Sequence, residues 1–374
     1  MKALRVSASV LKIIVGVIFI ISAVAKYITI DAFEMYVYSF GLFPMVLSFY
    51  LARLVIAAEL ILAASLISHR NHRFTLIASI LFLVCFVVFL TYAHLVGRTD
   101  NCHCFGDLIP FSPVQSIMKN AVLIILLLFV YKYASQEWYP RWWLVALIYI
   151  ATGAVMYLYM TKVLHVLDML SMVLMLVMLC VGVLASLPFY GRWYVTAALV
   201  LTPVVTVFIL TPPDSWFYRN SDERYDEELF RQQLMPSGCD SVSEDDTVAV
   251  SVLAGRGLDE GRQIVAFFSP KCGYCQLAAE KICTIAGRYD LDTSRITYVF
   301  PIVKDTAAYA GFYEHSRSPH YKEVRIDKTL FIRITRASFP IVLLLEDGQA
   351  VASYAYRNID EKMVREFLQP VDTE

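Results

Sequence analysis

The chain has 374 residues, of which 58% are apolar and only 17% are charged. An ordinary soluble domain carries about 25% charged residues, so this composition argues against a wholly soluble globular protein. Residues 1–213 hold 20 of the charged side chains at a net charge of +6, whereas residues 214–374 hold 45 at a net charge of −7. The two parts read as a membrane domain and a soluble domain, and neither has the basic stripe typical of nucleic-acid binding.

Seven apolar segments predict helices that cross a lipid bilayer. A bilayer core about 30 Å thick needs roughly 20 mostly apolar residues per helix. The segments that approach this length are 13–25, 44–67, 74–97, 114–131, 142–160, 163–188 and 193–210. The first is short, but residues 7–11 extend it. The expected fold of residues 1–213 is therefore a polytopic α-helical membrane domain of about seven transmembrane helices.

Lysine and arginine residues in the short loops predict the orientation of these helices, because such residues concentrate on the cytoplasmic side. A cytoplasmic N-terminus places eight of them inside, namely Lys2, Arg5, Lys12, Arg70, Arg73, Lys132, Arg141 and Arg192, and four outside, namely Lys26, Arg98, Lys119 and Lys162. Seven crossings then bring residues 214–374, together with the loop at 98–113, to the opposite side. We expect a multi-pass protein of the inner (cytoplasmic) membrane with a periplasmic C-terminal domain.

The first segment also fits a secretory signal peptide. It has a basic start, an apolar stretch, and Ala23-Val24-Ala25 as a cleavage site of the A-x-A type. Cleavage there would leave the other six crossings in the same orientation, so the functional prediction does not depend on the choice.

The second half of the chain begins with a polar, acidic segment, 214–246, that is typical of a tether. The elements predicted beyond it, in residues 247–374, are a strand at 264–268, a helix from 272 to 288, a strand at 296–303, a helix at 305–315, a hairpin of 341–345 and 351–356, and a helix at 360–368. This alternation predicts a compact α/β domain.

Residues 263–370 resemble a thioredoxin-like domain. Cys272-Gly273-Tyr274-Cys275 occupies the active-site position at the start of a helix, and Ser338-Phe339-Pro340 resembles that fold's cis-proline loop. Two features depart from the usual pattern: Lys271 stands where a tryptophan is usual, and Gly-Tyr separates the cysteines. Both leave the redox potential and the substrate open, because these depend on the groups around the sulfurs.

The spacing of Cys272 and Cys275 favours redox chemistry independently of the family. Two cysteines three residues apart can close a small disulfide ring, and a helix N-terminus stabilises a thiolate. Cys272, nearer the helix start, is expected to attack, and Cys275 to resolve the mixed disulfide, with the cation of Lys271 favouring the thiolate. A zinc site would need two more ligands, and Cys239 and Cys283 form no second C-x-x-C. These two could instead pair with each other, or remain unpaired.

The loop between the third and fourth apolar segments holds a second pair, in Asn101-Cys102-His103-Cys104-Phe105-Gly106-Asp107. We expect this loop to face water on the side of the C-terminal domain, where Cys102 and Cys104 could exchange disulfides. The alternatives are a local disulfide and a metal site in which His103 joins the two thiols.

Residues 10–135 resemble the four-helix family that joins the MauE type of methylamine-utilisation protein to the DoxX-like proteins. The stretches that carry the resemblance are Ser22-Ala23-Val24-Ala25-Lys26, Ala58-Glu59-Leu60-Ile61-Leu62, Cys102-His103-Cys104-Phe105-Gly106 and Lys119-Asn120. Such proteins are associated with forming or rearranging disulfides in exported proteins. The expected organisation is a MauE/DoxX-like domain at 1–135, three further helices at 136–213, the tether, and the thioredoxin-like domain.

Charged groups inside membrane helices are costly and thus candidates for function. Arg53 and Glu59 are six residues apart on one predicted helix, so they lie on different faces and make poor partners for each other. Glu59 could relay a proton or contact a quinone, or it could be a buried group paired with another helix, and we favour the structural role. His94 is a candidate proton acceptor near the cysteine loop, while Cys85 and Cys180 are expected to be packing residues.

The sequence therefore predicts a membrane-bound thiol–disulfide oxidoreductase. In this hypothesis Cys272/Cys275 exchanges with exported cysteine-containing proteins and with Cys102/Cys104, and a membrane quinone or another membrane redox partner completes the electron path. The alternative is a non-catalytic maturation factor that holds a metal or a client at Cys102-His103-Cys104. A transporter is weakly supported, because the sequence suggests no paired intramembrane charges and no interrupted helices.

Overall fold

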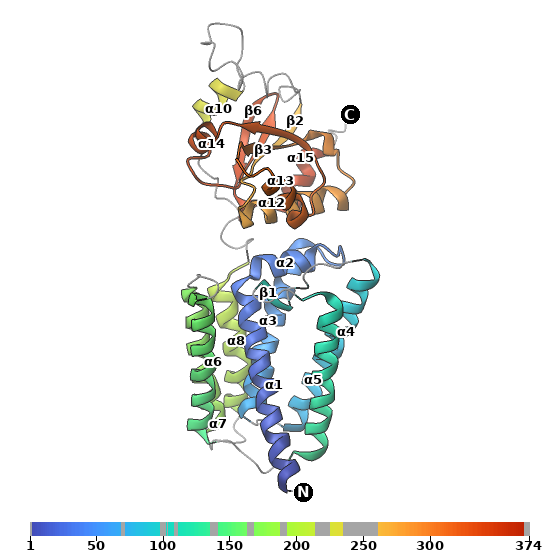
Figure 1. Cartoon of the computed structure of the whole chain (residues 1–374), viewed down its shortest axis with the longest axis vertical. Helices are drawn as coiled ribbons and strands as arrows, with labels where there is room; N and C mark the ends of the chain where they lie inside the picture. The colour runs from blue at the N-terminus through green and yellow to red at the C-terminus, as the bar shows by residue number, and fades with distance from the viewer. Residues whose placement is uncertain are drawn as a thin grey trace. The chain divides into compact units, whose positions relative to one another are not determined.

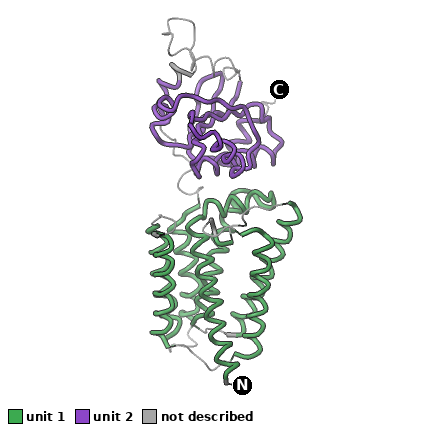
Figure 2. The backbone as a smooth tube through the Cα atoms, viewed as in Figure 1, with its two compact units in different colours: residues 1–213 green, residues 214–374 purple. Residues whose placement is uncertain are grey.

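A computed structural model describes residues 2–68, 72–97, 102, 104–107, 111–134, 141–162, 168–187, 193–213, 225–234 and 261–369. The chain divides into two compact units, residues 1–213 and residues 214–374 (Figure 2). Each unit is described by itself.

The first unit contains seven helices that are long and apolar enough to cross a membrane, as the sequence predicts. They are α1 (Lys2–Ile28), α3 (Met45–Ser68), α4 (His72–Leu95), α5 (Pro113–Tyr133), α6 (Trp142–Lys162), α7 (Met169–Ser186) and α8 (Trp193–Leu210) (Figure 1). Helix α7 begins six residues later than the predicted segment, because the carboxylate of Asp168 caps it by accepting hydrogen bonds from the N–H groups of Leu170 and Ser171. A short helix, α2 (Ile30–Tyr38), separates α1 from α3.

Helix α1 is an integral part of the bundle. It packs along α3 and also contacts α5 and the short strand β1 (Cys104–Asp107). Gly16 permits the approach to α3, since a Cβ at this position would lie 2.7 Å from Cγ1 of Ile67. The buried core of the unit includes Val15, Ile20 and Ala23 from α1.

The second unit is built on a five-stranded mixed sheet of order β4-β3-β2-β5-β6. The strands are β2 (Arg262–Phe267), β3 (Ile296–Pro301), β4 (Lys322–Ile326), β5 (Ile341–Glu346) and β6 (Gln349–Tyr354). Strands β2, β3 and β4 are mutually parallel, while β5 is antiparallel to both β2 and β6. Helix α12 (Gly273–Arg288) follows β2, and a cis peptide bond joins Phe339 to Pro340 just before β5. This is the thioredoxin-like arrangement that the sequence predicts.

Alternating residues of the strands bury both faces of the sheet. On one face Val265 and Phe267 pack in a cluster with Phe331 of helix α14 (Lys328–Thr335). On the other face the rings of Phe268 and Tyr298 make an edge-to-face contact, and Phe268 contacts Phe312 of helix α13 (Ala307–Ser316). Helix α15 (Glu361–Leu368) packs on α12. The strand that ends at Phe267 is therefore held rigidly from both sides, and it carries the chain into the cysteine motif.

Three elements of this unit are absent from the sequence prediction: β4, α14 and helix α10 (Glu227–Leu234). The prediction that 214–246 is entirely a tether is wrong for α10, because Phe230 is 2% exposed and packs 6.2 Å from the ring of Phe267. The N–H of Asp226 also donates to the carbonyl oxygen of Ile334 at 2.9 Å. The acidic composition of this segment gave no signal for a short amphipathic helix. Phe230 and Leu229 of this helix pack against the apolar cluster of the sheet.

Candidate functional site

The cysteine pair of the second unit lies where β2 turns into α12. Cys272 is the N-cap of this helix, and its sulfur accepts the N–H of Cys275 at 3.3 Å. The sulfur of Cys275 in turn accepts the N–H of Ser269 at 3.4 Å. Cys275 is fully buried, whereas Cys272 is partly exposed. The sulfur of Cys272 is therefore the more accessible of the two.

The surroundings of the two sulfurs separate their acidities. The hydrogen bond from Cys275, with the backbone N–H groups of Cys275 and Tyr274, lowers the pKa of Cys272 to about 7 against the opposing effect of burial. Burial, followed by the hydrogen bond to Cys272, raises the pKa of Cys275 far above its ordinary value. Near neutral pH the reduced pair thus holds one thiolate, at Cys272, and one thiol, at Cys275.

Lys271 does not play the predicted part. Its ammonium group lies 2.9 Å from the carboxylate of Asp305, on the exposed surface, and it is not among the groups that lower the pKa of Cys272. The expectation that Lys271 supports the thiolate is therefore wrong, because the acidic partner takes up its charge. The hydrogen bond from Cys275 and the backbone N–H groups at the helix start account for the acidity of Cys272.

The register of the sheet brings the proline loop to the cysteines. Phe267, at the end of β2, pairs with Ile341, at the start of β5. The chain toward Cys272 and the loop at Pro340 therefore lie at the same end of these two strands. Tyr274 is 49% exposed, and its ring lies 5.6 Å from that of Tyr356. A Cβ added at Gly273 would meet nothing within 4 Å. The surface at Gly273, next to Cys272, is thus open, and the aromatic rings of Tyr274 and Tyr356 lie near it.

The cysteine pair of the first unit is buried. The prediction that this pair faces water is therefore wrong. Cys102 is 1% exposed and Cys104 is 2% exposed. They pack in one cluster with Tyr36 of α2 and Leu90 of α4. The N–H of Cys102 donates to the carbonyl oxygen of Phe111 at 2.9 Å, which closes the loop against the start of α5. The short helix α2, which is not among the apolar segments predicted from the sequence, covers the pair through Tyr36.

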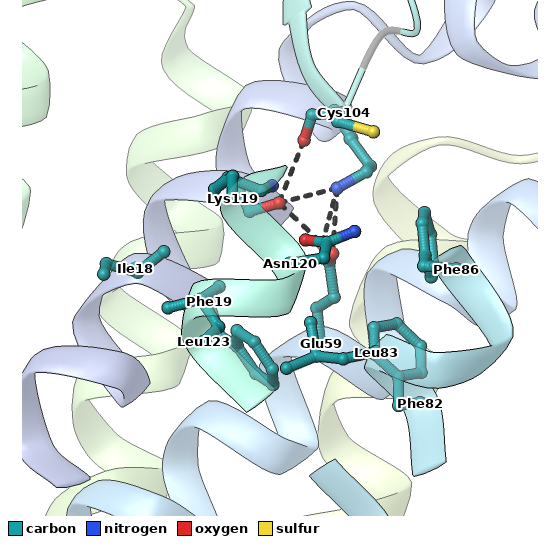
Figure 3. A pocket seen from close by; sticks show the side chains of 12 residues that line it. Ile18, Phe19, Glu59, Phe82, Leu83, Phe86, Cys104, Lys119, Asn120 and Leu123 are labelled. Carbon is teal, nitrogen blue, oxygen red and sulfur yellow. Dashed lines mark hydrogen bonds and ion pairs between the residues drawn. The ribbon is translucent and has the colours of Figure 1, made fainter. Parts of the chain in front are cut away.

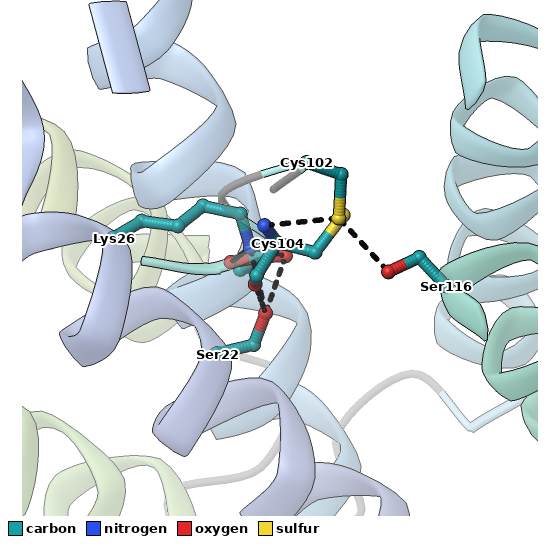
Figure 4. A network of polar contacts seen from close by, with 6 residues as sticks. Ser22, Lys26, Cys102, Cys104 and Ser116 are labelled. Atoms are coloured by element: carbon teal, nitrogen blue, oxygen red, sulfur yellow. Dashed lines mark hydrogen bonds and ion pairs between the residues drawn. The ribbon is translucent and has the colours of Figure 1, made fainter. Parts of the chain in front are cut away.

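Side chains from helices α1 and α5 contact this pair (Figure 4). The sulfur of Cys102 lies 2.9 Å from the hydroxyl of Ser116, in the first turn of α5, and accepts the N–H of Cys104 at 3.4 Å. Helix α5 starts here because Ser112 and Gln115 form a reciprocal capping box with Pro113 at the first position. From α1, the hydroxyl of Ser22 donates to the carbonyl oxygen of Cys104 at 2.9 Å.

A buried ion pair lies directly beneath Cys104. The ammonium group of Lys26 donates to both carboxylate oxygens of Glu59, at 2.8 and 3.0 Å, and to the hydroxyl of Ser22 at 2.6 Å. Ser22 also lies within hydrogen-bond distance of Glu59, at 3.2 Å. The chain of contacts therefore runs from Glu59 and Lys26 through Ser22 to the backbone of Cys104.

These groups line a small cavity together with Lys119 and Asn120 of α5 (Figure 3). The centre of a water molecule could occupy about 10 Å³ of it, which is room for about one water. The remaining walls are apolar, from Phe82, Leu83 and Phe86 of α4 and from residues of α1 and α5. A quinone ring does not fit this space, so the expectation of a quinone at Glu59 receives no support from the cavity.

The two cysteines of the membrane unit also differ in acidity. The hydrogen bond from Cys104, joined by those from Ser116 and the backbone and by the charge of Lys119, lowers the pKa of Cys102 to about 6. The hydrogen bond to Cys102 and burial raise the pKa of Cys104 well above its ordinary value. Cys102 therefore corresponds to Cys272, and Cys104 to Cys275.

The intramembrane charges predicted from the sequence are all paired. Arg53 and Glu59 are not partners, as the sequence predicts; Arg53 contacts Glu34 at 2.7 Å and Glu59 contacts Lys26. The expectation that the membrane domain lacks paired charges is wrong, because each partner lies on a different helix. Lys26 and Lys119, counted above as loop cations, both belong to the interior of the bundle.

Other candidates are placed away from the pair. His94 is exposed in the last turn of α4, and within the part of the chain that the structure describes its ring makes no hydrogen bond to either cysteine. Cys85 and Cys180 are exposed on their helices, so the expectation that they are packing residues is wrong. In the second unit the Cys283 sulfur lies 3.3 Å from the carbonyl oxygen of Glu280. His103 and Cys239 lie outside the described residues, which leaves the metal site and the Cys239–Cys283 pairing as predictions.

Sequence reasoning missed four site residues: Ser22, Lys26, Ser116 and Lys119. Three of them stand in the stretches that carry the family resemblance, so the signal was present but had no assigned role. Ser116 carries no such signal, because a serine in the first turn of a helix is usually read as part of its cap.

The fold and the two cysteine sites define a polytopic membrane protein with a thioredoxin-like unit. Residues 4–133 match the family model described as methylamine utilisation protein MauE, so the N-terminal region contains a MauE-type domain. Protein TlpB of Flavobacterium psychrophilum is 36% identical over 135 residues, which cover 34% of this chain and 36% of that relative. The alignment thus spans about a third of the relative's length.

Two solved structures are similar to part of this chain. One is the solution structure of a thiol:disulfide interchange protein from Bacteroides sp., which is 14% identical and covers 32% of this chain and 80% of its own, with a TM-score of 0.26. The other is the crystal structure of the thioredoxin domain of a thiol-disulfide oxidoreductase from Bacteroides vulgatus, which is 16% identical and covers 35% of this chain and 87% of its own, with a TM-score of 0.25.

Proposed function

We propose that this protein is a membrane-bound thiol–disulfide oxidoreductase with two exchanging cysteine pairs. The observation that carries the proposal is the same arrangement at both pairs: the first sulfur accepts the backbone N–H of the second cysteine, whose own side chain is buried. This arrangement goes with a lowered pKa of the first cysteine and a raised pKa of the second. An inert structural cysteine has no need of a lowered pKa, whereas an exchanging one reacts as the thiolate.

At the thioredoxin-like pair, the Cys272 thiolate attacks one sulfur of a client disulfide and forms a mixed disulfide, releasing the other client sulfur as a thiolate. Cys275 then loses its proton and attacks the sulfur of Cys272, which releases the client dithiol and leaves a Cys272–Cys275 disulfide. The reverse sequence delivers a disulfide to a reduced client. The loop at Pro340 and the ring of Tyr274 border the exposed side of Cys272, where an extended client segment would lie.

At the membrane pair, Cys102 is the exchanging sulfur and Cys104 the resolving one. Because Cys102 is buried against α2, this helix must move when the thioredoxin-like unit, or another partner, reaches the Cys102 sulfur. Such a closed state protects an acidic thiolate from unspecific oxidation between exchanges. The pair then passes electrons to, or receives them from, a further membrane redox partner.

The orientation is part of the proposal. With a cytoplasmic N-terminus, the thioredoxin-like unit and the Cys102 loop both face the periplasm, and the clients are exported proteins that contain cysteines. The segment between the units raises the effective concentration of one cysteine pair near the other.

Trapping of the mixed disulfide tests the proposal. In the full chain with Cys275→Ala, the Cys272 thiolate can attack but not resolve, so a disulfide between Cys272 and Cys102 or a client should accumulate on non-reducing gels. The matched control is Cys272→Ala with Cys275→Ala, which should show no adduct. Peptide mass spectrometry identifies the partner cysteine. Absence of any adduct of Cys272, in protein that retains its thermal stability, would refute the relay.

A further inference from the structure

The charges around Cys104 do not balance while both cysteines are neutral. Lys26 of α1 and Lys119 of α5 supply two ammonium groups, and Glu59 of α3 supplies one carboxylate. Lys26 and Glu59 neutralise each other at 2.8 Å. The ammonium of Lys119 instead lies 4.4 Å from the ring centroid of Phe105, and among the described residues it makes no ion pair with a carboxylate.

The elements around this cavity offer few other charges. Helix α4 contributes phenyl and leucyl side chains, α2 contributes Tyr36 to the adjoining cluster, and α5 adds the neutral amide of Asn120. A cation in such low-polarity surroundings is costly unless an anion lies near it, and a cation–π contact offsets only part of this cost. Among the residues whose side chains the structure describes, the acidic groups near Lys119 other than Glu59 are the two thiols.

We propose that Lys119 is the counter-cation of the reduced Cys102/Cys104 pair, and that it makes this pair the electron acceptor of the two pairs in the molecule. Reduction of the Cys102–Cys104 disulfide creates one thiolate, which Lys119 neutralises, whereas the disulfide leaves Lys119 uncompensated. The charge of Lys119 therefore favours the reduced form over the oxidised form, and stabilisation of the reduced form makes a cysteine pair more oxidising.

The acidities of the two sulfurs agree with this placement. Lys26 and Lys119 both act to lower the pKa of Cys104, although the hydrogen bond to Cys102 and burial outweigh them. Lys119 also contributes to the lowered pKa of Cys102. The positive charge thus acts on the pair as a whole, which shares a single proton.

Among the described residues, no such cation acts on Cys272 of the thioredoxin-like pair. Lys271, the basic residue next to Cys272, is neutralised by Asp305, and the backbone N–H groups are the stabilising donors. The membrane pair has the same kind of backbone donor, with the hydroxyl of Ser116 and the charge of Lys119 in addition. Its reduced form is therefore the more stabilised of the two.

The direction of exchange follows, and this step rests on the proposed function. The Cys272 thiolate attacks Cys102 in the Cys102–Cys104 disulfide, forming a Cys272–Cys102 bond and leaving the thiolate on Cys104. Cys275 gives its proton to Cys104 and attacks Cys272, so that the Cys272–Cys275 disulfide forms and Cys102 leaves as the thiolate. Two electrons pass to the membrane pair, and the thioredoxin-like unit becomes the oxidised partner that donates disulfides to clients.

Redox titration of the full chain tests the inference. In protein with Cys272→Ala and Cys275→Ala, reconstituted in nanodiscs, the reduced fraction of Cys102/Cys104 is measured in glutathione buffers by acid quench, alkylation and peptide mass spectrometry. Lys119→Gln should lower the ratio of reduced to oxidised pair by about tenfold, which is about 30 mV for a two-electron couple. Lys119→Arg, which keeps the charge, should stay within about twofold of the parent. Lys132→Gln, the same change on an exposed residue of α5, should have no effect.

Glu59→Gln supplies a test of opposite sign. Loss of this carboxylate leaves Lys26 uncompensated as well, so the reduced form should be favoured more strongly than in the parent. Shifts of the same sign in Lys119→Gln and Glu59→Gln would mean that both changes merely loosen the site, and would overturn the inference. If Lys119→Gln fails to fold, the ratio of reduced to oxidised pair can still be compared between Glu59→Gln and Lys119→Arg. This ratio should be higher in Glu59→Gln.

A second titration compares the two pairs. In full-length protein with Cys102→Ala and Cys104→Ala, the Cys272/Cys275 pair should be about tenfold less reduced than the membrane pair in the same buffer. The reverse order would overturn the proposed direction. If Cys102 and Cys104 form no disulfide at any glutathione ratio, the proposed function itself falls; if they do and Lys119→Gln leaves the ratio unchanged, only this inference falls.

Discussion

The two cysteine pairs reach the same chemical state by different structural means. Cys272 owes its acidity to the side chain of Cys275 and to backbone N–H groups at the start of one helix, and these described groups lie within three residues of it in the sequence. The membrane pair depends on groups that lie far apart in the chain: Ser116 of α5 contacts Cys102, and the Ser22–Lys26–Glu59 network of α1 and α3 contacts Cys104. A locally built site should tolerate distant changes, whereas the membrane site should respond to each helix that supports it.

The largest effect that separates the two pairs is expected from removing one sulfur at a time. Cys272→Ser should reduce client exchange to the uncatalysed background, because the attacking thiolate is lost. Cys102→Ser should leave exchange of a small disulfide with Cys272 intact and abolish only re-oxidation of Cys272/Cys275 in membranes. Stopped-flow exchange with a small aromatic disulfide and thiol labelling in membranes distinguish the two. Equal loss in both assays for both variants would mean that the pairs act as one site.

The supporting ion pairs should differ in the same way. Lys26→Met leaves the carboxylate of Glu59 buried without its cation, which should destabilise the membrane unit by about 3–5 kcal/mol. Removal of the half-exposed pair between Arg262 and Glu346 in the other unit by Arg262→Gln should cost about 0–1 kcal/mol. Thermal unfolding in detergent, monitored by intrinsic fluorescence, measures both. Similar melting temperatures for the two variants would contradict the structural role of Lys26.

The pH dependence of alkylation should differ between the sulfurs of Cys272 and Cys102 by about one pH unit. Alkylation of Cys272 should rise with pH and reach half its maximum near pH 7, and that of Cys102 near pH 6, because only the thiolate reacts. The pKa of Cys272 is lower in the folded than in the unfolded state. Its ionisation therefore stabilises the reduced folded protein at pH above the unfolded value, and this stability is lost as the pH falls through about 7. Coincident alkylation profiles would remove the distinction.

A smaller effect is expected at Ser116. Ser116→Ala removes the hydroxyl that lies 2.9 Å from the sulfur of Cys102, and a hydrogen bond to a charged group is worth about 1.5–3 kcal/mol. Alkylation of Cys102 at pH 6 should therefore slow by about tenfold, while Ser116→Thr should restore it. The profile of Cys272 in the same protein is the internal control, and a parallel change there would indicate a global effect.

The smallest effect is expected at Lys271. Because its ammonium is engaged with Asp305 at the surface, Lys271→Met should leave the alkylation profile of Cys272 unchanged. A clear shift of that profile to higher pH would restore the role that the sequence suggests for this lysine.

Local patterns account for what the sequence predicts correctly. The seven transmembrane helices follow from apolar runs, and the thioredoxin-like order follows from short strands, a C-x-x-C motif at a helix start and a proline before a hairpin. Helix α10 was missed because its contact with the core rests on Phe230 and few neighbours, within an acidic segment. The positions of lysines and arginines predict that the loop of Cys102 faces water. They indicate on which side of the membrane a loop lies, but they do not indicate which residues cover it.

The amino-acid sequence alone determined which cysteines are paired by spacing, where the helices cross the bilayer, and that one pair begins a helix, because these properties depend on neighbours in the chain. Only the tertiary structure decided that Cys102 and Cys104 are buried, that Lys26 meets Glu59, and that Lys119 lies beside them with no ion pair to a carboxylate of the described residues. Contacts between helices depend on how their faces turn toward one another, and uniformly apolar segments do not encode that rotation in any local pattern.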